Sequence, residues 1–393
     1  MKKNWQTVEL QDIAEVGRGK FSVRPRNDPK YFGGDIPFLQ TGDVAGASGS
    51  IISTYSQTLN EEGLKVSKFF PAGTLLITIA ANIGDVAEVG FGFACTDSLV
   101  AVQPKEGVDK NWLKFFLQTQ KSYFESRATQ NAQANINLQT IRPLLIELPP
   151  KNEQTAIASL LSTWDLFIEK TERLIAAKEK QKKSFMQSLL TGKQRVKGFQ
   201  KSWSEFNLSE LFKERSERGN EVLPLISITR ENGIIPRNED RKDTSNEDKS
   251  KYLRICPGDI GYNTMRMWQG VSALSSLEGI VSPAYTICTP KKSVDGEFMA
   301  YLFKLPRIIN LFYRHSQGLT SDTWNLKYHH FQEIKVTIPK IEEQKAIART
   351  LKVCDEELDL LKKQADAYRR QKRGLMQRLL TGEWRVKVNG VTQ

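Results

Sequence analysis

The 393-residue chain has little sulfur or imidazole chemistry and no long apolar run. Its three histidines have no cysteine partner at zinc-ligand spacing, and its cysteines are scattered, which argues against a zinc site and a disulfide framework and favours a reducing cytoplasm. The longest apolar stretch, residues 74–81, falls well short of the roughly 18 residues that a membrane helix needs. The first twelve residues also lack the apolar core of a secretory signal. We therefore expect a cytoplasmic protein with no membrane contact. The four cysteines are Cys95, Cys256, Cys288 and Cys354.

The familiar catalytic motifs are missing as well. Residues 17–20 contain Gly-Arg-Gly-Lys without the spacing of a phosphate-binding loop, and no dinucleotide fingerprint or His-Glu-x-x-His motif occurs. The Leu-Pro-Pro-Lys at 148–151 differs from the Asn/Asp-Pro-Pro-Tyr/Phe of amino-methyltransferases. Asp259, in the turn Pro-Gly-Asp, is a possible nuclease acid, but such a turn before a strand is more often structural. The sequence thus favours a non-catalytic protein with no cofactor or metal of its own.

A long internal repeat organises what is present. Residues 149–197 recur as residues 339–387 at a fixed offset of 190, including Pro-x3-Glu-Gln-x-Ala-Ile-Ala, Leu-Leu-Thr-Gly and Arg-Val-Lys. The regions before the two copies resemble each other more faintly, as in the alignment of Trp5 with Trp203. The predicted order is globular, helical, globular, helical. The four predicted segments are 1–148, 149–202, 203–338 and 339–393.

The repeated segments predict two long helices. Their apolar residues follow a 4-3-4-3 spacing, which is typical of a heptad seam. A proline precedes each helix, and Gly192 and Gly382 stand where a helix would end. About 38 residues give a rod of roughly 57 Å. One seam cannot bury itself, so we expect the two helices to pack antiparallel. The seam residues predicted are Ile157, Leu161, Trp164, Ile168, Ile175, Phe185, Leu189, Ile347, Leu351, Leu358, Leu361, Leu375 and Leu379.

Two lysines occupy matched seam positions, Lys182 and Lys372. A polar residue in a seam often sets register at a cost in stability, so one hypothesis is that these lysines fix how the helices align. The alternative is that their stems extend from a frayed end of the seam to solvent.

The two globular segments have the mixed pattern of an α+β fold. Residues 75–80 and 280–289 are predicted strands, and residues 112–124 and 298–312 are predicted helices. The fold class expected is therefore α+β: two globular domains alternate with two long helices that pack as an antiparallel coiled coil, in a pseudo-two-fold repeat.

The net charge of +12 is concentrated in the helical segments, and neither globular segment is strongly basic. Binding to a polyanion would therefore need local basic patches. Residues 17–26 carry four basic side chains on a Gly- and Pro-containing loop, and residues 262–270 mix Arg, Asn and Gln with aromatics. Amide-rich stretches occur at matched places, at 129–137 and 316–325. Arg, Asn and Gln are side chains that read base edges, although each stretch could also be an ordinary surface loop.

Two variable globular domains alternating with near-identical helical regions that carry these motifs resemble the specificity subunit of a Type I restriction–modification system. The resemblance spans essentially the whole chain. It implies two target-recognition domains, each reading half of a bipartite site on double-stranded DNA, and helices that set the spacer and dock two modification (methyltransferase) subunits. A rod of roughly 57 Å exceeds the ~34–36 Å of one DNA turn, so it could hold two domains in successive major grooves. S-adenosylmethionine, ATP and Mg²⁺ would be bound by the modification subunits and by additional restriction (endonuclease/translocase) subunits.

The DNA contacts of this family lie in loops that differ between members, so the DNA-binding residues are nominated from the polar loops. Two alternative interpretations remain. One is a coiled-coil adaptor without DNA specificity, favoured by the near-neutral domains. The other is a nuclease or methyltransferase acting alone, which the missing motifs argue against. The nominated residues are Arg18, Lys20, Arg24, Arg26, Asn131 and Gln133 in the first domain, and Arg266, Trp268, Gln269, Gln317, Thr320 and Asn325 in the second.

Overall fold

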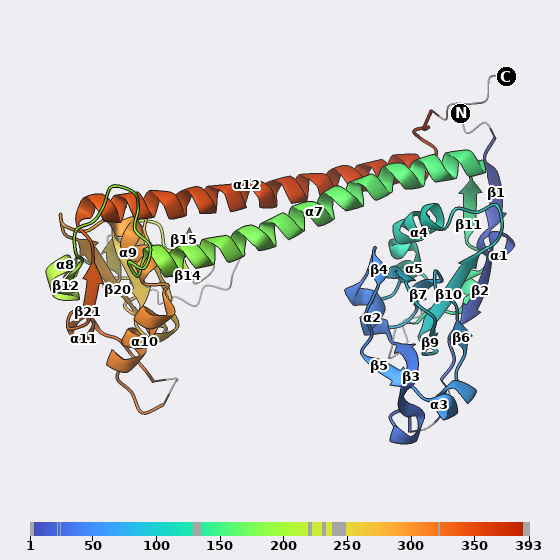
Figure 1. Cartoon of the computed structure of the whole chain (residues 1–393), viewed down its shortest axis with the longest axis horizontal. Helices are drawn as coiled ribbons and strands as arrows, with labels where there is room; N and C mark the ends of the chain where they lie inside the picture. Colours follow the sequence, from blue (N-terminus) through green and yellow to red (C-terminus); the bar gives the residue numbers. More distant parts are fainter. Residues whose placement is uncertain are drawn as a thin grey trace. The chain divides into compact units, whose positions relative to one another are not determined.

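The computed structural model divides into two compact units (Figure 1). The first unit comprises Met1–Glu172 and Lys363–Gln393, and the second comprises Arg173–Lys362. Each unit contains one globular domain and one part of each long helix, so the units cut across the four segments predicted from the sequence. The residues that the structure describes are 4–21, 23, 25–128, 135–218, 222–229, 233–237, 249–320 and 323–387.

The two repeated segments form long helices of equal length. Helix α7 spans Lys151–Leu189 and helix α12 spans Ile341–Leu379, with 39 residues each. Three residues after each helix the chain turns at a glycine with a left-handed backbone, Gly192 (φ 71°) and Gly382 (φ 73°). Glycine is the residue that adopts this conformation without steric cost, which is why the Leu-Leu-Thr-Gly motif ends both helices.

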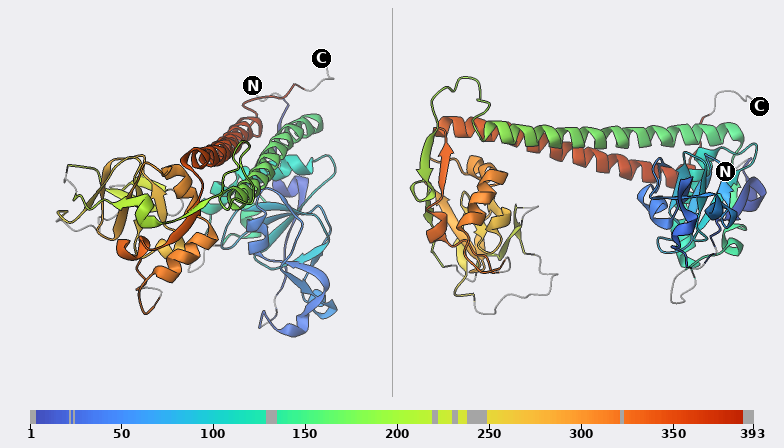
Figure 2. Two further views of the ribbon diagram at one scale, coloured as in Figure 1. Left: turned by 60° about the vertical axis from the view of Figure 1, so that its left-hand side comes forward. Right: turned by 60° about the horizontal axis from the view of Figure 1, so that its bottom comes forward.

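The two helices run antiparallel within each unit, as the sequence predicts, and Figure 2 shows them side by side. As the residue number rises along α7, the number of the residue it pairs with on α12 falls. The seam lysines Lys182 and Lys372 each pair with an aspartate on the other helix, as expected if they set the register of the helices; that role stays a prediction. Ion pairs join Asp165 to Lys372 and Glu172 to Arg369 in the first unit, and Lys178 to Glu357 and Lys182 to Asp355 in the second.

The predicted seam residues are all buried or half-buried. Those near the helix ends pack into the globular cores as well as against the other helix. Ile157, Leu161 and Leu379 belong to the core of the first unit, and Leu189, Ile347 and Leu351 to that of the second. Toward the helix centres, Trp164 packs against Tyr368 with ring centroids 5.7 Å apart. Leu358 is also buried, and Trp164, Ile168, Ile175, Phe185, Leu361 and Leu375 are half-buried.

The segment that follows each long helix docks on the beginning of the other. In the first unit, Arg385 donates two hydrogen bonds to Glu153, which is 3% exposed and also accepts from the Trp5 indole at 3.1 Å. In the second unit, Arg195 donates two hydrogen bonds to Glu343, both at 2.6 Å. The Glu of the Glu-Gln motif and the Arg of the Arg-Val-Lys motif are therefore partners across the repeat.

The domain of the first unit is built on two sheets. A five-stranded sheet has the order β2-β10-β7-β8-β4, a four-stranded sheet has the order β5-β3-β9-β6, and β1 pairs with β11. Its helices α4 and α5 contribute Trp112, Phe115 and Phe124 to the core. The strands are β1 (Gln6–Glu9), β2 (Ala14–Arg18), β3 (Phe32–Leu39), β4 (Ile51–Ile52), β5 (Gln57–Leu59), β6 (Phe69–Phe70), β7 (Leu75–Thr78), β8 (Val86–Val89), β9 (Phe93–Cys95), β10 (Leu99–Pro104) and β11 (Leu145–Leu148). The helices are α1 (Leu10–Ile13), η1 (Pro29–Tyr31), α2 (Thr41–Gly46), α3 (Glu61–Lys65), α4 (Lys110–Thr119), α5 (Lys121–Ser126) and α6 (Leu138–Ile141).

The domain of the second unit repeats the central part of this plan. Its four-stranded sheet has the order β13-β20-β17-β18, and the pairs β12-β21, β14-β15 and β16-β19 complete it. The strands are β12 (Ser204–Asn207), β13 (Phe212–Glu214), β14 (Ile226–Thr229), β15 (Gly233–Pro236), β16 (Leu253–Ile255), β17 (Ile260–Asn263), β18 (Ser272–Leu274), β19 (Gly279–Val281), β20 (Tyr285–Pro290) and β21 (Lys335–Ile338). The helices are α8 (Leu208–Leu211), η2 (Met267–Gln269), α9 (Gly296–Leu302), α10 (Pro306–His315) and α11 (Tyr328–Phe331).

Three predicted elements are each divided in the structure. The predicted strand 280–289 is two strands, β19 and β20, because Pro283 cannot donate to a sheet ladder. The predicted helix 298–312 is α9 and α10, and Pro306 starts the second of them. The predicted helix 112–124 is α4 and α5, separated at Gln120. The strand predicted at 75–80 ends at Thr78.

No helix among the described residues is long and apolar enough to cross a membrane.

Candidate DNA interface

In the second unit, an aromatic cluster joins two of the polar loops singled out in the sequence. The Trp268 ring lies edge-on to Trp324 at a centroid distance of 5.0 Å, and the Tyr313 ring also lies edge-on to Trp324, at 4.8 Å. The Trp268 indole donates to the Met265 carbonyl at 3.0 Å. The loop 262–270 and the loop 316–325 are therefore neighbours, which the sequence did not show.

Backbone hydrogen bonds hold these loops in place. The Thr264 amide donates to the Ala284 carbonyl, and the Leu326 amide donates to the Thr264 carbonyl, both at 2.9 Å. Gln317 and Asn325 exchange two backbone hydrogen bonds, which close the second loop at its base. Gly318 lies so close to the Thr323 backbone that a Cβ there would collide at 2.7 Å. A loop fixed by its own backbone can present side chains to a ligand without a large ordering cost.

The nominated residues of this domain lie on these two loops. Arg266 is exposed at the start of η2, and its guanidinium forms no ion pair with any described residue. Gln317 and Thr320 are exposed, and Gln269 is half-buried. The Asn325 side-chain oxygen is buried and has no hydrogen-bond partner among the described residues. This set combines cationic, amide and aromatic groups, which are the groups that contact phosphates and base edges.

Two exposed cations and several exposed apolar side chains extend the same loops. Arg314 stands at the end of α10, and Lys327 follows Asn325 by two residues. Met265 is 43% exposed and Leu319 is fully exposed. Sequence reasoning missed Tyr313 and Trp324 as part of the site, although Trp324 directly precedes the nominated Asn325.

The first domain presents its nominated residues differently. Arg18 donates to the Asp97 carbonyl, and Arg26 donates to both Asp97 carboxylate oxygens at 3.1 Å. Two of the nominated arginines are therefore hydrogen-bonded to Asp97. Nothing in the sequence indicated these contacts, because more than 70 residues separate the partners. Lys20, two residues after Arg18, is exposed. The nominated Arg24, Asn131 and Gln133 lie outside the described residues.

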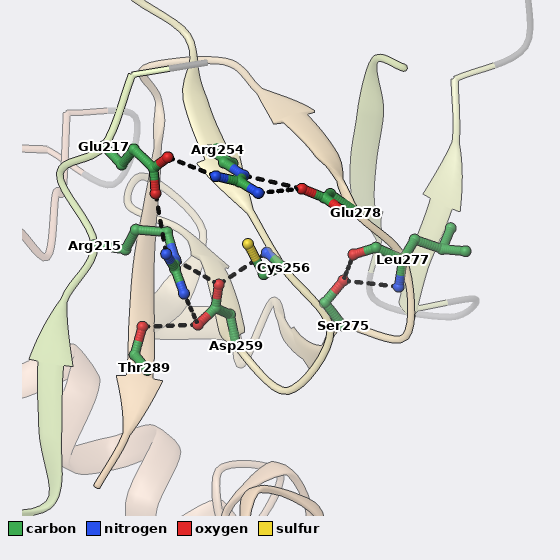
Figure 3. Close-up of polar contacts among 9 residues, drawn as sticks. All are labelled: Arg215, Glu217, Arg254, Cys256, Asp259, Ser275, Leu277, Glu278 and Thr289. Carbon is green, nitrogen blue, oxygen red and sulfur yellow. Dashed lines mark hydrogen bonds and ion pairs between the residues drawn. The ribbon is translucent and has the colours of Figure 1, made fainter. Parts of the chain in front are cut away.

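The acid that resembled a nuclease residue is part of a structural network (Figure 3). Asp259 is 1% exposed and accepts hydrogen bonds from Arg215 at 2.7 and 3.2 Å, from the Thr289 hydroxyl at 2.7 Å and from the Cys256 amide at 2.8 Å. Hydrogen bonding to Asp259 raises the pKa of Arg215, so the arginine stays charged. With both carboxylate oxygens engaged, Asp259 is placed to stabilise the turn before β17.

The network continues from Arg215 through Glu217 to Arg254. Arg254 lies between Glu217 and Glu278 and donates to both carboxylates. The hydrogen bond from Arg254 lowers the pKa of Glu217. Among the residues that the structure describes, no group of three or more His, Cys, Asp or Glu side chains could hold a metal ion.

Comparisons with known proteins identify the family of the chain and proteins that share its fold. A family model described as the Type I restriction modification DNA specificity domain matches residues 2–179 and 200–367. A Methanocaldococcus jannaschii protein named as the MjaX type I restriction enzyme specificity subunit is 26% identical, over 98% of this chain and 95% of its own length. The crystal structure of a Type I restriction–modification S subunit from M. genitalium superposes with a TM-score of 0.57 at 17% identity, covering 96% of each chain. A chain from a structural study of complex assembly and conformational transition in the type I system gives a TM-score of 0.61 at 14% identity, over 97% of this chain and 99% of that one. At these identities the solved structures show a shared fold.

Proposed function

Because this chain belongs to the family of Type I restriction–modification DNA specificity proteins, we propose that its two globular domains are target-recognition domains that each read one half of a bipartite DNA site. The reading takes place in the major groove, where every base pair presents a distinct pattern of donors and acceptors. The chain supplies sequence recognition, and the chemistry belongs to other subunits.

The aromatic, amide and cationic side chains on the two joined loops of the second unit support this proposal most strongly. Trp268 and Trp324 fix the loops against each other, and Arg266 beside them is exposed. An arginine that is free of acidic partners can bind guanine bidentately or hold a phosphate. The domain of the first unit repeats the same sheet order around β7 and β10, so the chain contains two such readers.

The helices α7 and α12 set the number of unspecified base pairs between the half-sites and dock two modification subunits. Those subunits carry S-adenosylmethionine, and restriction subunits with ATP and Mg²⁺ join the complex in the cytoplasm. The matched repeat supports two equivalent docking surfaces, because each unit contains the Glu-Gln start of one helix and the Leu-Leu-Thr-Gly end of the other.

The test is long-read modification sequencing of a methylation-deficient host that expresses this chain with its neighbouring modification subunit. We expect one methylated motif made of two short half-sites with a fixed gap. Replacing residues 1–148 by the corresponding domain of another specificity subunit should change one half-site only. A stable complex that methylates nothing and binds duplex DNA without the steep salt dependence of phosphate contacts would instead support a coiled-coil adaptor.

A further inference from the structure

The turn that follows the central strand of the first domain matches the base-reading loop of the second. Strand β7 pairs with β10 and β8, as β17 pairs with β20 and β18. Directly after β7, the Ile79 amide donates to Ser98 and the Ile79 carbonyl accepts from Ile136, both at 3.1 Å. Thr264, directly after β17, makes the two equivalent contacts: its amide donates to Ala284 and its carbonyl accepts from Leu326. Residues 80–83 therefore stand where the second domain places residues 265–269.

This turn also touches the amide-rich stretch of the first domain. Ala80 forms a backbone bridge with Asn135, which belongs to the amide-rich stretch 129–137 singled out in the sequence. In the second domain the corresponding loops meet through Trp268 and Trp324. The same two chain segments are thus brought together in each unit, although none of the residues nominated in the first domain lies on the 80–83 turn.

The turn holds a strained backbone under firm restraint. Ala81 has a φ of 64°, a left-handed conformation that a residue with a Cβ rarely adopts because the Cβ comes too close to the following carbonyl oxygen. The buried Thr78 hydroxyl donates to the Asn82 carbonyl, and Gly84 donates to the Thr78 carbonyl at 2.9 Å. Strain of this kind concentrates at functional sites, where the surrounding structure maintains it.

The strained turn presents Asn82 to solvent. Asn82 is exposed between the buried Ile79 and Ile83, and its side-chain amide makes no hydrogen bond with any described residue. The oxygen of an asparagine side chain can accept a hydrogen bond from N6 of adenine while its NH2 group donates one to N7, which makes asparagine a bidentate partner of that base.

From this geometry we infer that Asn82 is a specificity-determining residue that reads a base in the first half-site, with adenine as the base its amide fits. The inference rests on the proposed function, and it names a contact that lies outside the basic loop 17–26. Asp97 engages Arg18 and Arg26, whereas the Asn82 side chain makes no hydrogen bond with any described residue.

The experiment compares methylated motifs for the intact complex and for two variants, in the same methylation-deficient host. Asn82→Ala should relax one position of the first half-site and weaken binding to the cognate duplex by on the order of tenfold, leaving the second half-site and the gap unchanged. Asn82→Asp retains the side-chain shape and loses the donor, so the preferred base at that position should shift toward cytosine, whose N4 donates to a carboxylate.

Asn111→Ala is the matched control, because Asn111 belongs to the same domain but lies on the first turn of α4. It should leave the motif intact. An unchanged first half-site in both Asn82 variants, with a normal bipartite motif for the unaltered chain, overturns the inference and leaves the proposed function standing. If the unaltered chain gives no bipartite motif, the proposed function fails and the inference fails with it.

Discussion

At the scale of single residues, Arg266 is the clearest candidate for direct base contact. It is exposed at the start of η2 beside the Trp268–Trp324 contact and is not neutralised by any described acid. In the first domain, by contrast, Asp97 binds Arg26 through both carboxylate oxygens. An arginine paired with a carboxylate must give up that partner before it can bind DNA, and this lowers its net contribution to the free energy of DNA binding.

Arg266→Ala should weaken binding to the cognate duplex by about 1–3 kcal/mol and relax specificity at one position of the second half-site. The physical reason is the loss of a bidentate contact to one base. Titrations of the complex with duplexes carrying each base at that position would measure both effects. An equal loss of affinity on every sequence would make Arg266 a phosphate contact instead.

At the scale of elements, each lysine of the helix seam contacts two other helices of its unit. Lys182 pairs with Asp355 and lies 5.6 Å from the ring centroid of Tyr301 on α9, while the Tyr301 hydroxyl donates to Asp355 at 2.6 Å. Burial and the hydrogen bond to Asp355 raise the pKa of Tyr301, so it stays protonated. In the first unit, Lys372 pairs with Asp165 and lies 4.9 Å from the Phe115 ring on α4. Each lysine thus links both long helices to a helix of the globular domain.

Lys182→Leu should loosen the register of the helices, so that the complex tolerates more than one gap length between half-sites. The leucine keeps the seam apolar but leaves Asp355 without its cation. The measurement is the distribution of gap lengths among methylated sites, and Lys183→Leu on the exposed side of the same helix is the control. A gap distribution that stays as narrow as that of the unaltered chain, with normal assembly, would refute the register hypothesis.

At the scale of the whole molecule, the first unit is built from both ends of the chain. It comprises Met1–Glu172 and Lys363–Gln393, and Arg385 of the second of these segments binds the buried Glu153 at the start of α7. The second unit has the equivalent pair, Arg195 and Glu343, within one continuous stretch. Loss of the arginine leaves a buried carboxylate with fewer donors, which is unfavourable in either unit.

Arg385→Ala should destabilise the first unit by about 1–3 kcal/mol, because the Trp5 indole remains the only side-chain donor to Glu153 among the described residues. Hydrogen–deuterium exchange should then become faster in β1, β11 and the start of α7, and remain unchanged in β12 and β21. Arg195→Ala is the reciprocal variant, and it should speed exchange in β12, β21 and the start of α12. Uniform changes in both units for either variant would contradict this assignment.

The repeat, the two long helices with their ends and the pairing of the two apolar seams could be predicted from the sequence alone, because helix periodicity and terminal glycines are local signals. The sequence also indicated which loops are polar enough to meet DNA. The three-dimensional structure was needed to show that Trp268 contacts Trp324, that Asp97 binds Arg18 and Arg26, and that Asp259 forms an ion pair with Arg215. It was also needed to show that the turn carrying Asn82 in the first domain corresponds to the loop after β17 in the second. These outcomes depend on contacts between residues far apart in the chain, whose partners are chosen by sheet pairing and packing and leave no local trace in the sequence.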